Sequence, residues 1–380
     1  MSVEELSGSV HGWADPRLER VVERLRTHVA DDPDHSFQVA AFAGGELVLD
    51  AWAGPHLGEQ SLMVPYSVSK NTLGLTVGLL IERGLLDLDA PVAEVWPAFA
   101  AHGKQNLTIR QLLSHQAGLP QATPALSWDE LLDDHVGAER LAASTPLWHP
   151  GSAFGYHGLT IANLVGGVVH GITGRSVRAY FEDEIRAPLG IDVHLGLPHS
   201  EHARVQPVLP MIRPVSAAAS TFAPTPFTAL AFQPAGPALD AGNDPRSWTY
   251  GHPSVSATVD ARGLARLFAA TVTGVDGVAP LLSADTVAQI GQQQVRGYDE
   301  VLGQPNRAHG IVFQKPSPGL DFGGARAFGH DGAMGALACV DPDTGISFGY
   351  TVARGPWPGG ADPRAVAVAR DLAPILGVSS

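Results

Sequence analysis

A serine and a lysine three positions apart are the first residues in this chain whose types and spacing could do chemistry. Residues 67–70 read Ser-Val-Ser-Lys and open a segment, 67–82, that is predicted to be a helix. Residues spaced by three share one helix face, so the Ser67 hydroxyl and the Lys70 amine are expected to be neighbours. A lysine amine can accept a serine proton when burial keeps the amine neutral. Ser67 is therefore a candidate nucleophile and Lys70 a candidate base.

Two further segments carry groups that such a pair would need. Tyr156 lies in a turn between Pro150-Gly151 and the helix expected from residue 159, where a phenol could project into a cleft. Residues 329–335 read Gly-His-Asp-Gly-Ala-Met-Gly and lead into a strand-like run. Glycines there permit close backbone approach to a ligand and could leave an N–H free for an oxyanion.

Hydrophobic periodicity predicts the elements that must position these residues. Helices are expected at 17–29, 67–82, 107–115, 127–132, 159–170, 177–186, 260–273, 283–293 and 365–372. Strands are expected at 37–43 and 47–52, joined as a hairpin, and at 310–313, 336–340 and 346–352. The Pro/Ala/Thr-rich segment 216–243 is expected to be a long loop. Strands near both chain ends, with helices between them, predict an antiparallel sheet whose N- and C-terminal strands meet.

Composition limits the classes of protein that this chain can be. It has 380 residues, 44% of them hydrophobic, which allows a sizeable core. The net charge of −14, without a basic stripe, makes nucleic acid and anionic membranes poor partners. The acidic start lacks a secretory signal and no apolar stretch is long enough to span a membrane, so a cytoplasmic location is expected. The single cysteine, Cys339, excludes an intrachain disulfide and a multi-cysteine metal site, and its strand-like flanks favour a structural thiol.

The motifs and their order resemble those of the serine β-lactamase and penicillin-binding-protein superfamily, in its esterase branch, the family VIII carboxylesterases. The Ser-x-x-Lys motif lies at 67–70, Tyr156-His157-Gly158 stands at the Tyr-x-Asn position, and His330-Asp331-Gly332 stands at the Lys-Thr-Gly position. The segments 85–92 and 107–119 also look like those of family members. The resemblance covers roughly residues 44–353.

The resemblance implies acyl transfer through an acyl-enzyme on Ser67. Lys70 and Tyr156 would share the proton of Ser67 and pass it to the leaving group, and water would release the acyl group. By similarity, the backbone N–H groups of Ser67 and Ala333 would form the oxyanion hole. His330, Asp331 and Gly332 would line the substrate side of the site. No metal and no cofactor is implied.

Two departures from the family pattern favour esters over amides. Gly158 stands where β-lactamases and peptidases carry an asparagine that binds a substrate amide. His330 stands where they carry a lysine that helps to bind a substrate carboxylate, and Asp331 adds a negative charge beside it. A site without those polar groups should favour neutral esters.

Two other motifs in the sequence do not indicate a functional site. Gly345-Ile346-Ser347-Phe348-Gly349 matches the Gly-x-Ser-x-Gly pattern of α/β-hydrolases, but it lies inside a predicted strand, so Ser347 is interpreted as a strand residue. His199 and His202 are spaced like metal ligands but follow Pro198 in a polar loop and are interpreted as solvated.

The sequence therefore predicts an α+β, β-lactamase/transpeptidase-like fold: an antiparallel sheet flanked by helices, plus a mostly helical subdomain. Residues 1–380 are expected to form one unit, with the α/β part at about 10–85 and 255–380 and the helical part at about 86–254. The expected activity is hydrolysis of small-molecule carboxylic esters. A β-lactam or D-amino-acid amide hydrolase, an acyltransferase on the same scaffold, and a non-catalytic binding module stay open as alternatives. The oligomeric state is not predicted.

Overall fold

A seven-stranded antiparallel sheet joins the two ends of the chain. The computed structural model describes residues 4–215, 224–233 and 238–377. Across the sheet the strand order is β1-β2-β4-β3-β12-β11-β9. The strand bounds are Glu4–Leu6 (β1), Val10–Ala14 (β2), Phe37–Ala43 (β3), Glu46–Ala53 (β4), Phe328–Asp331 (β9), Leu337–Asp341 (β11) and Ile346–Val352 (β12). The N- and C-terminal strands meet where β3 pairs with β12, in a register that places Phe37 opposite Val352.

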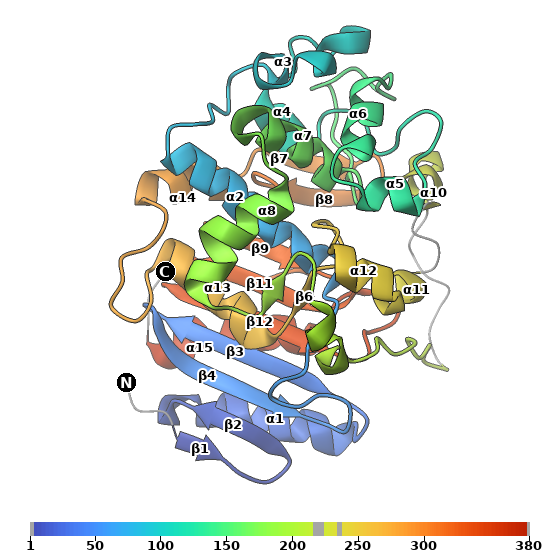
Figure 1. Ribbon diagram of the computed structural model, residues 1–380. Coiled ribbons are helices and arrows are strands. Elements are labelled where there is room, and N and C mark those ends of the chain that lie inside the picture. Colours follow the sequence, from blue (N-terminus) through green and yellow to red (C-terminus); the bar gives the residue numbers. More distant parts are fainter. Residues whose placement is uncertain (1–3, 216–223, 234–237, 378–380) are drawn as a thin grey trace.

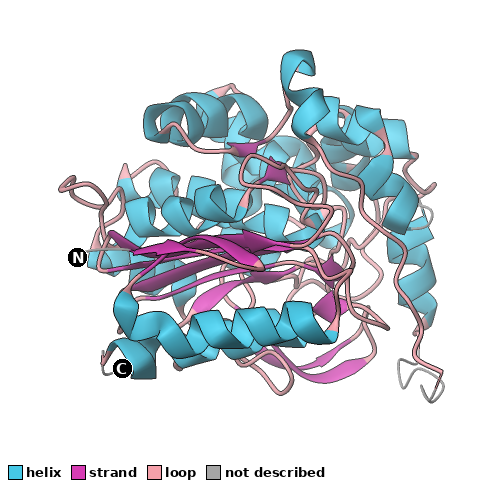
Figure 2. Ribbon diagram, turned by 90° about the horizontal axis from the view of Figure 1, so that it is seen from below, coloured by secondary structure: helices cyan, strands magenta, loops and turns pink. Residues whose placement is uncertain are grey.

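Helices cover both faces of the sheet (Figure 2). On one face, α1 (Glu19–Asp31) and α15 (Pro363–Leu376) pack in one hydrophobic cluster with Phe37 and Val39 of β3. On the other face, α13 (Ala261–Val272) packs against Ala40 and Phe42. Because alternate residues of a strand face opposite sides, the mostly apolar sequence of β3, with Gln38 as its one polar residue, supplies both interfaces.

The helix that carries Lys70 lies between the sheet and a group of shorter helices (Figure 1). This helix, α2 (Lys70–Glu82), is buried from Lys70 to Leu80, and the short helix η2 (Tyr66–Ser69) leads into it. Its apolar residues belong to the largest hydrophobic cluster, which extends from the shorter helices to β11. A helix that is apolar on all sides is stable only when other elements enclose it.

The remaining elements connect and surround these layers. The helices are α3 (Val92–Val95), α4 (Ile109–Leu113), α5 (Trp128–Leu132), α6 (Val136–Ala142), α7 (Ile161–Thr173), α8 (Val177–Phe181), α9 (Ala187–Leu189), α10 (Pro226–Phe232), α11 (Ala238–Asn243), α12 (Pro245–Tyr250) and α14 (Ala284–Gly291). The short helices are η1 (Pro16–Leu18), η3 (Pro97–Gly103), η4 (Glu182–Arg186) and η5 (His199–Arg204). Two-stranded sheets pair β5 (Val193–His194) with β6 (Thr258–Val259), β7 (Val295–Asp299) with β8 (Gln304–His309), and β10 (Met334–Gly335) with β13 (Gly360–Ala361).

Two expectations from the sequence were wrong. Residues 310–313 form a bend rather than a strand, and Val312 has a φ of 66°, which no strand accommodates. The segment 216–243 contains the helices α10 and α11, although parts of it, 216–223 and 234–237, lie outside the described residues. Pro226 occupies the first turn of α10 behind the capping residue Thr225, and a proline is favourable at that position.

Periodicity missed the hairpin formed by β7 and β8, which lies among the shorter helices in Figure 1. Its strands, VRGYD and QPNRAH, contain mostly polar residues together with Gly and Pro, so their sequences lack the regular apolar alternation that marks a half-buried strand. Within the described ranges, no helix has the length and apolar character needed to cross a bilayer.

Candidate active site

A sharp turn directly before Ser67 presents its side chain to a cleft. The preceding residue, Tyr66, has a φ of 52°, a left-handed conformation that is uncommon for a residue other than glycine. Ser67 lies in η2, and Lys70 begins α2 one turn later. The Lys70 Nζ atom lies 3.1 Å from the Ser67 Oγ atom. The helical spacing read from the sequence thus brings these two side chains within hydrogen-bond distance.

Lys70 is completely buried, and no carboxylate of the described residues forms an ion pair with it. Its Nζ atom donates hydrogen bonds to the carbonyl oxygens of Gly158 and Ser254, each at 2.7 Å. Burial lowers the pKa of Lys70 well below its usual value, and the nearby charge of Asp331 opposes part of that shift. A neutral amine has two N–H donors, which the two carbonyls accept, and its lone pair is then free to face the Ser67 hydroxyl.

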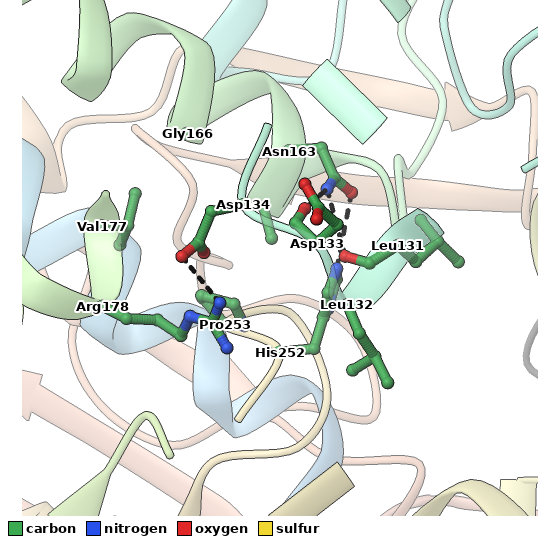
Figure 3. A pocket seen from close by; sticks show the side chains of 11 residues that line it. Leu131, Leu132, Asp133, Asp134, Asn163, Gly166, Val177, Arg178, His252 and Pro253 are labelled. Carbon is green, nitrogen blue, oxygen red and sulfur yellow. Dashed lines mark hydrogen bonds and ion pairs between the residues drawn. The ribbon is translucent and has the colours of Figure 1, made fainter. Parts of the chain in front are cut away.

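The Ser254 carbonyl is held by a network of buried polar groups. The Ser254 hydroxyl donates to the carbonyl of Leu159 at 2.9 Å and accepts from the N–H of Ala162 at 3.0 Å. Beside it, His252 and Pro253 line a small cavity that Figure 3 shows together with Asn163. This cavity has a volume of about 20 Å³, which is far too small for an ester. Its residues therefore support the loop that orients the Ser254 carbonyl.

Tyr156 places a second group that can exchange a proton beside Ser67. Its hydroxyl lies 2.7 Å from the Ser67 Oγ atom, and its ring lies 4.9 Å from the Lys70 Nζ atom. Its backbone N–H donates to the buried carboxylate of Asp299, at the end of β7, at 3.0 Å. Burial raises the pKa of the Tyr156 phenol, so the phenol keeps its proton. Ser67 therefore lies between a lysine that burial makes neutral and a tyrosine that burial keeps protonated.

A layer of buried histidines surrounds the Tyr156 ring. The Nε2 atom of His330 lies 3.4 Å from the Tyr156 hydroxyl, and its Nδ1–H donates to the Asp331 carbonyl at 2.7 Å. That second bond assigns the Nε2 atom as the acceptor in neutral His330. His309 stacks on Tyr156 at 6.1 Å between ring centres, and His115 lies 5.3 Å away. Burial lowers the pKa of each of these histidines, so they are neutral at neutral pH.

The edge strand β9 completes the rim of the site. His330 and Asp331 end this strand, and Gly332 and Ala333 follow in the turn to β10. A Cβ atom at Gly332 would overlap the carbonyl oxygen of Pro65, so only glycine allows the turn to approach η2 this closely. Among the described residues, none accepts a hydrogen bond from the backbone N–H of Ser67 or of Ala333. These two N–H groups can therefore receive an oxyanion.

The site opens into a cavity of about 570 Å³. Its wall combines apolar side chains with charged and polar ones. The lining residues are Ser67, Tyr156, Met211, Phe232, Leu302, Gln304, Arg307, Gln314, Pro318, Gly319, Leu320, Asp331, Ala333, Pro358, Gly359, Gly360 and Ala361. Its volume is within the range typical of small-molecule sites. Of the candidate residues from the sequence, Ser67, Tyr156, Asp331 and Ala333 line this cavity, whereas Lys70, His330 and Gly332 lie behind its surface.

The space beside Gly158 is filled by a side chain from helix α10. A Cβ atom there would overlap the ring of Phe232, at the end of α10. Phe232 itself lines the cavity and contacts the Tyr156 ring at 6.5 Å between centres. An aromatic ring therefore occupies the space that a longer side chain at position 158 would need.

The other residues singled out in the sequence lie elsewhere. Ser347 is buried in β12, opposite Phe42 of β3, in agreement with its interpretation as a strand residue. Cys339 is buried in β11, and burial raises its thiol pKa. The rings of His199 and His202 contact each other in η5. In the described part of the chain, no group of three or more His, Cys, Asp or Glu side chains could hold a metal ion.

Sequence reasoning missed four contributors to the site: Ser254, Asp299, Phe232 and Arg307. Ser254 acts through its backbone carbonyl, which every residue type possesses, so no sequence signal could identify it. Asp299 is far from Tyr156 along the chain and reaches it because β7 and β8 fold back as a hairpin. The Phe-containing segment around Phe232 was interpreted as loop. Arg307 lies in the hairpin whose strands periodicity did not reveal.

Comparisons with known proteins agree on the family. The family model described as Beta-lactamase matches residues 25–372. The Esterase/beta-lactamase LipL of Mycobacterium tuberculosis is 32% identical over 369 residues, covering 89% of this chain and 82% of that protein. The structure of EstA from Arthrobacter nitroguajacolicus Rue61a has a TM-score of 0.89 and 36% identity, covering 99% of both chains. A family VIII carboxylesterase structure has a TM-score of 0.85 and 27% identity, covering 95% of this chain and 98% of that one.

The chain therefore belongs to the Beta-lactamase family. It is an esterase/beta-lactamase-like hydrolase with the β-lactamase/transpeptidase-like α+β fold that the sequence predicted. The resemblance drawn from the three short motifs is confirmed by these matches over nearly the whole chain.

Proposed function

We propose that the protein is a carboxylesterase that hydrolyses small-molecule esters through an acyl-enzyme on Ser67. The observation that carries this proposal is the position of the Ser67 Oγ atom, 3.1 Å from the Lys70 amine and 2.7 Å from the Tyr156 hydroxyl, at the wall of the cavity. A serine becomes an effective nucleophile when a neighbouring base accepts its proton.

In the acylation step, Lys70 acts as the base. Its neutral amine accepts the Ser67 proton while the Ser67 oxygen attacks the ester carbonyl carbon. The backbone N–H groups of Ser67 and Ala333 stabilise the negative charge that forms on the carbonyl oxygen. Tyr156 then donates its proton to the departing alkoxide, and the proton that Lys70 took from Ser67 passes from the ammonium group to the Tyr156 oxygen, so that both groups return to their starting protonation states. The alcohol leaves and the acyl group stays on Ser67.

In the deacylation step, a water molecule takes the place of the alcohol. The same pair of groups removes a proton from the water as its oxygen attacks the acyl carbon, and returns that proton to the Ser67 oxygen. Neutral His330, whose Nε2 atom lies 3.4 Å from the Tyr156 hydroxyl and whose ring packs against the phenol, orients Tyr156 in both steps. Asp331 and Gly332 hold the β9 edge against the substrate.

Ester specificity over amides is supported by the position of Phe232. An amide substrate is best held by a side-chain amide that exchanges hydrogen bonds with it, and leaving its N–H unpaired in a buried site is costly. Here the space beside Gly158 contains an aromatic ring, which offers no such bond. An ester has no N–H that needs a partner. The volume of about 570 Å³ suits a small or medium-sized ester.

The experiment that tests this proposal is a hydrolysis panel on the purified protein and its Ser67→Ala variant. The panel contains p-nitrophenyl esters of increasing acyl length, a chromogenic cephalosporin and a D-alanyl amide. We expect turnover of the esters that is lost in Ser67→Ala, with unchanged thermal unfolding. Ester turnover by Ser67→Ala at a rate near the parent would refute the role of Ser67.

The same panel separates the alternatives. Faster turnover of the cephalosporin or the amide than of every ester would move the assignment to a β-lactam or peptide hydrolase. Products formed with an added alcohol in preference to water would identify an acyltransferase. A protein that neither turns over the panel nor reacts at Ser67 with a fluorophosphonate would be a binding module. The cytoplasmic location remains a prediction, which cell fractionation tests.

A further inference from the structure

Arg307 is a cation on the wall of the active-site cavity that the proposed mechanism does not use. It lies in β8, opposite Gly297 of β7, and lines the same cavity as Ser67 and Tyr156. Two residues further along β8, the ring of His309 stacks on the ring of Tyr156. Side chains two apart in a strand share one face, so Arg307 and His309 both face the site.

The guanidinium group of Arg307 makes no direct polar contact with a described residue, although the buried carboxylate of Asp299 lies close enough to interact with it electrostatically. No ion pair or hydrogen bond joins the guanidinium to any of the described residues, and its Nε atom is buried without an acceptor. Other half-buried arginines in this chain are paired: Arg204 with Asp192, and Arg178 with Asp134. A buried donor without an acceptor is destabilising, and a bound ligand is one of the partners that can satisfy it.

The surroundings of Arg307 favour an anionic ligand group. Gln304 and Gln314 line the same cavity and add polar side chains. The carboxylate of Asp331 also lines the cavity, and one of its oxygens is already engaged because it accepts a hydrogen bond from the backbone N–H of Ala361 at 3.2 Å. The chain as a whole has a net charge of −14 and repels anions at long range, so selection of one depends on a local cation.

We propose that Arg307 determines specificity by binding a carboxylate of the substrate, so that the preferred esters carry a negative charge, contrary to the preference for neutral esters expected from positions 330 and 331 of the sequence. This inference rests on the proposed esterase function of the same cavity. A guanidinium binds a carboxylate through two parallel charge-assisted hydrogen bonds, which gives orientation as well as affinity. The apolar side chains of Met211, Phe232 and Leu320 would contact the uncharged part of the substrate.

Two pairs of shape-matched esters test the proposal and locate the carboxylate. In the acyl pair, the mono-p-nitrophenyl ester of adipic acid is compared with p-nitrophenyl 6-methylheptanoate. In the alcohol pair, 4-carboxyphenyl acetate is compared with 4-isopropylphenyl acetate. In each pair an isopropyl group replaces the carboxylate, so the ratio of the two kcat/KM values reports recognition of charge. The Ser67→Ala variant provides the blank and tests the esterase function separately.

We expect Arg307→Gln to reduce the anionic-to-neutral ratio about 10- to 100-fold in one of the two pairs, as loss of a charged hydrogen-bonded partner does. Arg307→Lys should retain part of the preference for the anionic ester, because lysine keeps the positive charge but cannot form the two parallel hydrogen bonds of a guanidinium. Arg296→Gln is the matched control, since Arg296 is an exposed residue of β7 that does not line the cavity. A ratio that is unchanged by Arg307→Gln in both pairs, or changed equally by Arg296→Gln, would overturn the proposal while leaving the esterase function intact.

Discussion

Replacing Tyr156 by phenylalanine removes a single oxygen atom from the centre of the proposed proton relay. That atom lies 2.7 Å from Ser67 Oγ and 3.4 Å from His330 Nε2. The ring stays in place among its aromatic neighbours, and the backbone N–H of residue 156 keeps its bond to Asp299. The expected change in the free energy of unfolding is therefore small, about 1 kcal/mol, as for one buried hydrogen bond.

The expected change in activity is much larger and depends on the leaving group. A positioned general acid contributes about 10²–10⁴-fold to a rate, which equals about 2.7–5.4 kcal/mol at about 1.36 kcal/mol per tenfold. A p-nitrophenolate leaves readily without a proton, so its ester should show a loss near the lower end. An alkoxide leaves poorly without one, so an alkyl ester should show a loss near the upper end.

The assay compares kcat/KM of the parent and Tyr156→Phe for p-nitrophenyl acetate and for an ethyl ester, followed by p-nitrophenol absorbance and by acid release. We expect the loss for the ethyl ester to exceed the loss for the p-nitrophenyl ester by at least about tenfold, which lies within the contribution of a general acid. Equal losses with both substrates would refute proton donation to the leaving group by Tyr156. A loss that accompanies a large fall in melting temperature would also refute it.

Three further predictions concern the site and its support. Asp331→Asn should shift the acid limb of the kcat/KM pH profile to lower pH, because the Asp331 charge raises the pKa of Lys70 and its removal lets the amine lose its proton sooner. Gly158→Ala should lower the free energy of unfolding by about 1–3 kcal/mol through overlap with Phe232, and Phe232→Ala in the same chain should restore most of it in urea titrations. Burial raises the pKa of Asp260 to about 7, above its unfolded value near 4, so this group makes the protein less stable as pH rises between those values. Asp260→Asn should remove that contribution, and a parent-minus-variant difference in unfolding free energy that is flat from about pH 4 to 7 would contradict the argument.

The nucleophile and its base were predictable because one local rule relates them. Helical spacing alone predicts that the side chains of Ser67 and Lys70 are neighbours, and their atoms lie 3.1 Å apart. Tyr156 required the family resemblance, since its distance along the chain says nothing about its distance in space. The bounds of the strands 37–43 and 346–352 agree with the sequence prediction because both runs are mostly apolar and rich in β-branched and aromatic residues.

The rest of the site depends on tertiary contacts that leave no mark in a local pattern. The Lys70 amine is held by two backbone carbonyls, at Gly158 and Ser254, and carbonyls are the same in every residue. Arg307 reaches the cavity through a polar hairpin whose residues resemble a surface loop in the sequence. The catalytic roles of the residues and the proposed division of the chain into an α/β and a helical part remain predictions.

The pairing of β3 with β12 also determines when the protein can fold during its synthesis. Residues 37–43 form backbone hydrogen bonds with residues 346–352, so the central strand pair cannot form until a ribosome has synthesised almost the entire chain. Closing so long a loop before its contacts are gained makes such folds slow. During that interval the edge of β3 and the apolar surface of α2 are uncovered, and such surfaces associate with other chains. We therefore expect newly made chains to depend on chaperones, and a chain that ends before residue 346 to aggregate rather than to retain a partial fold.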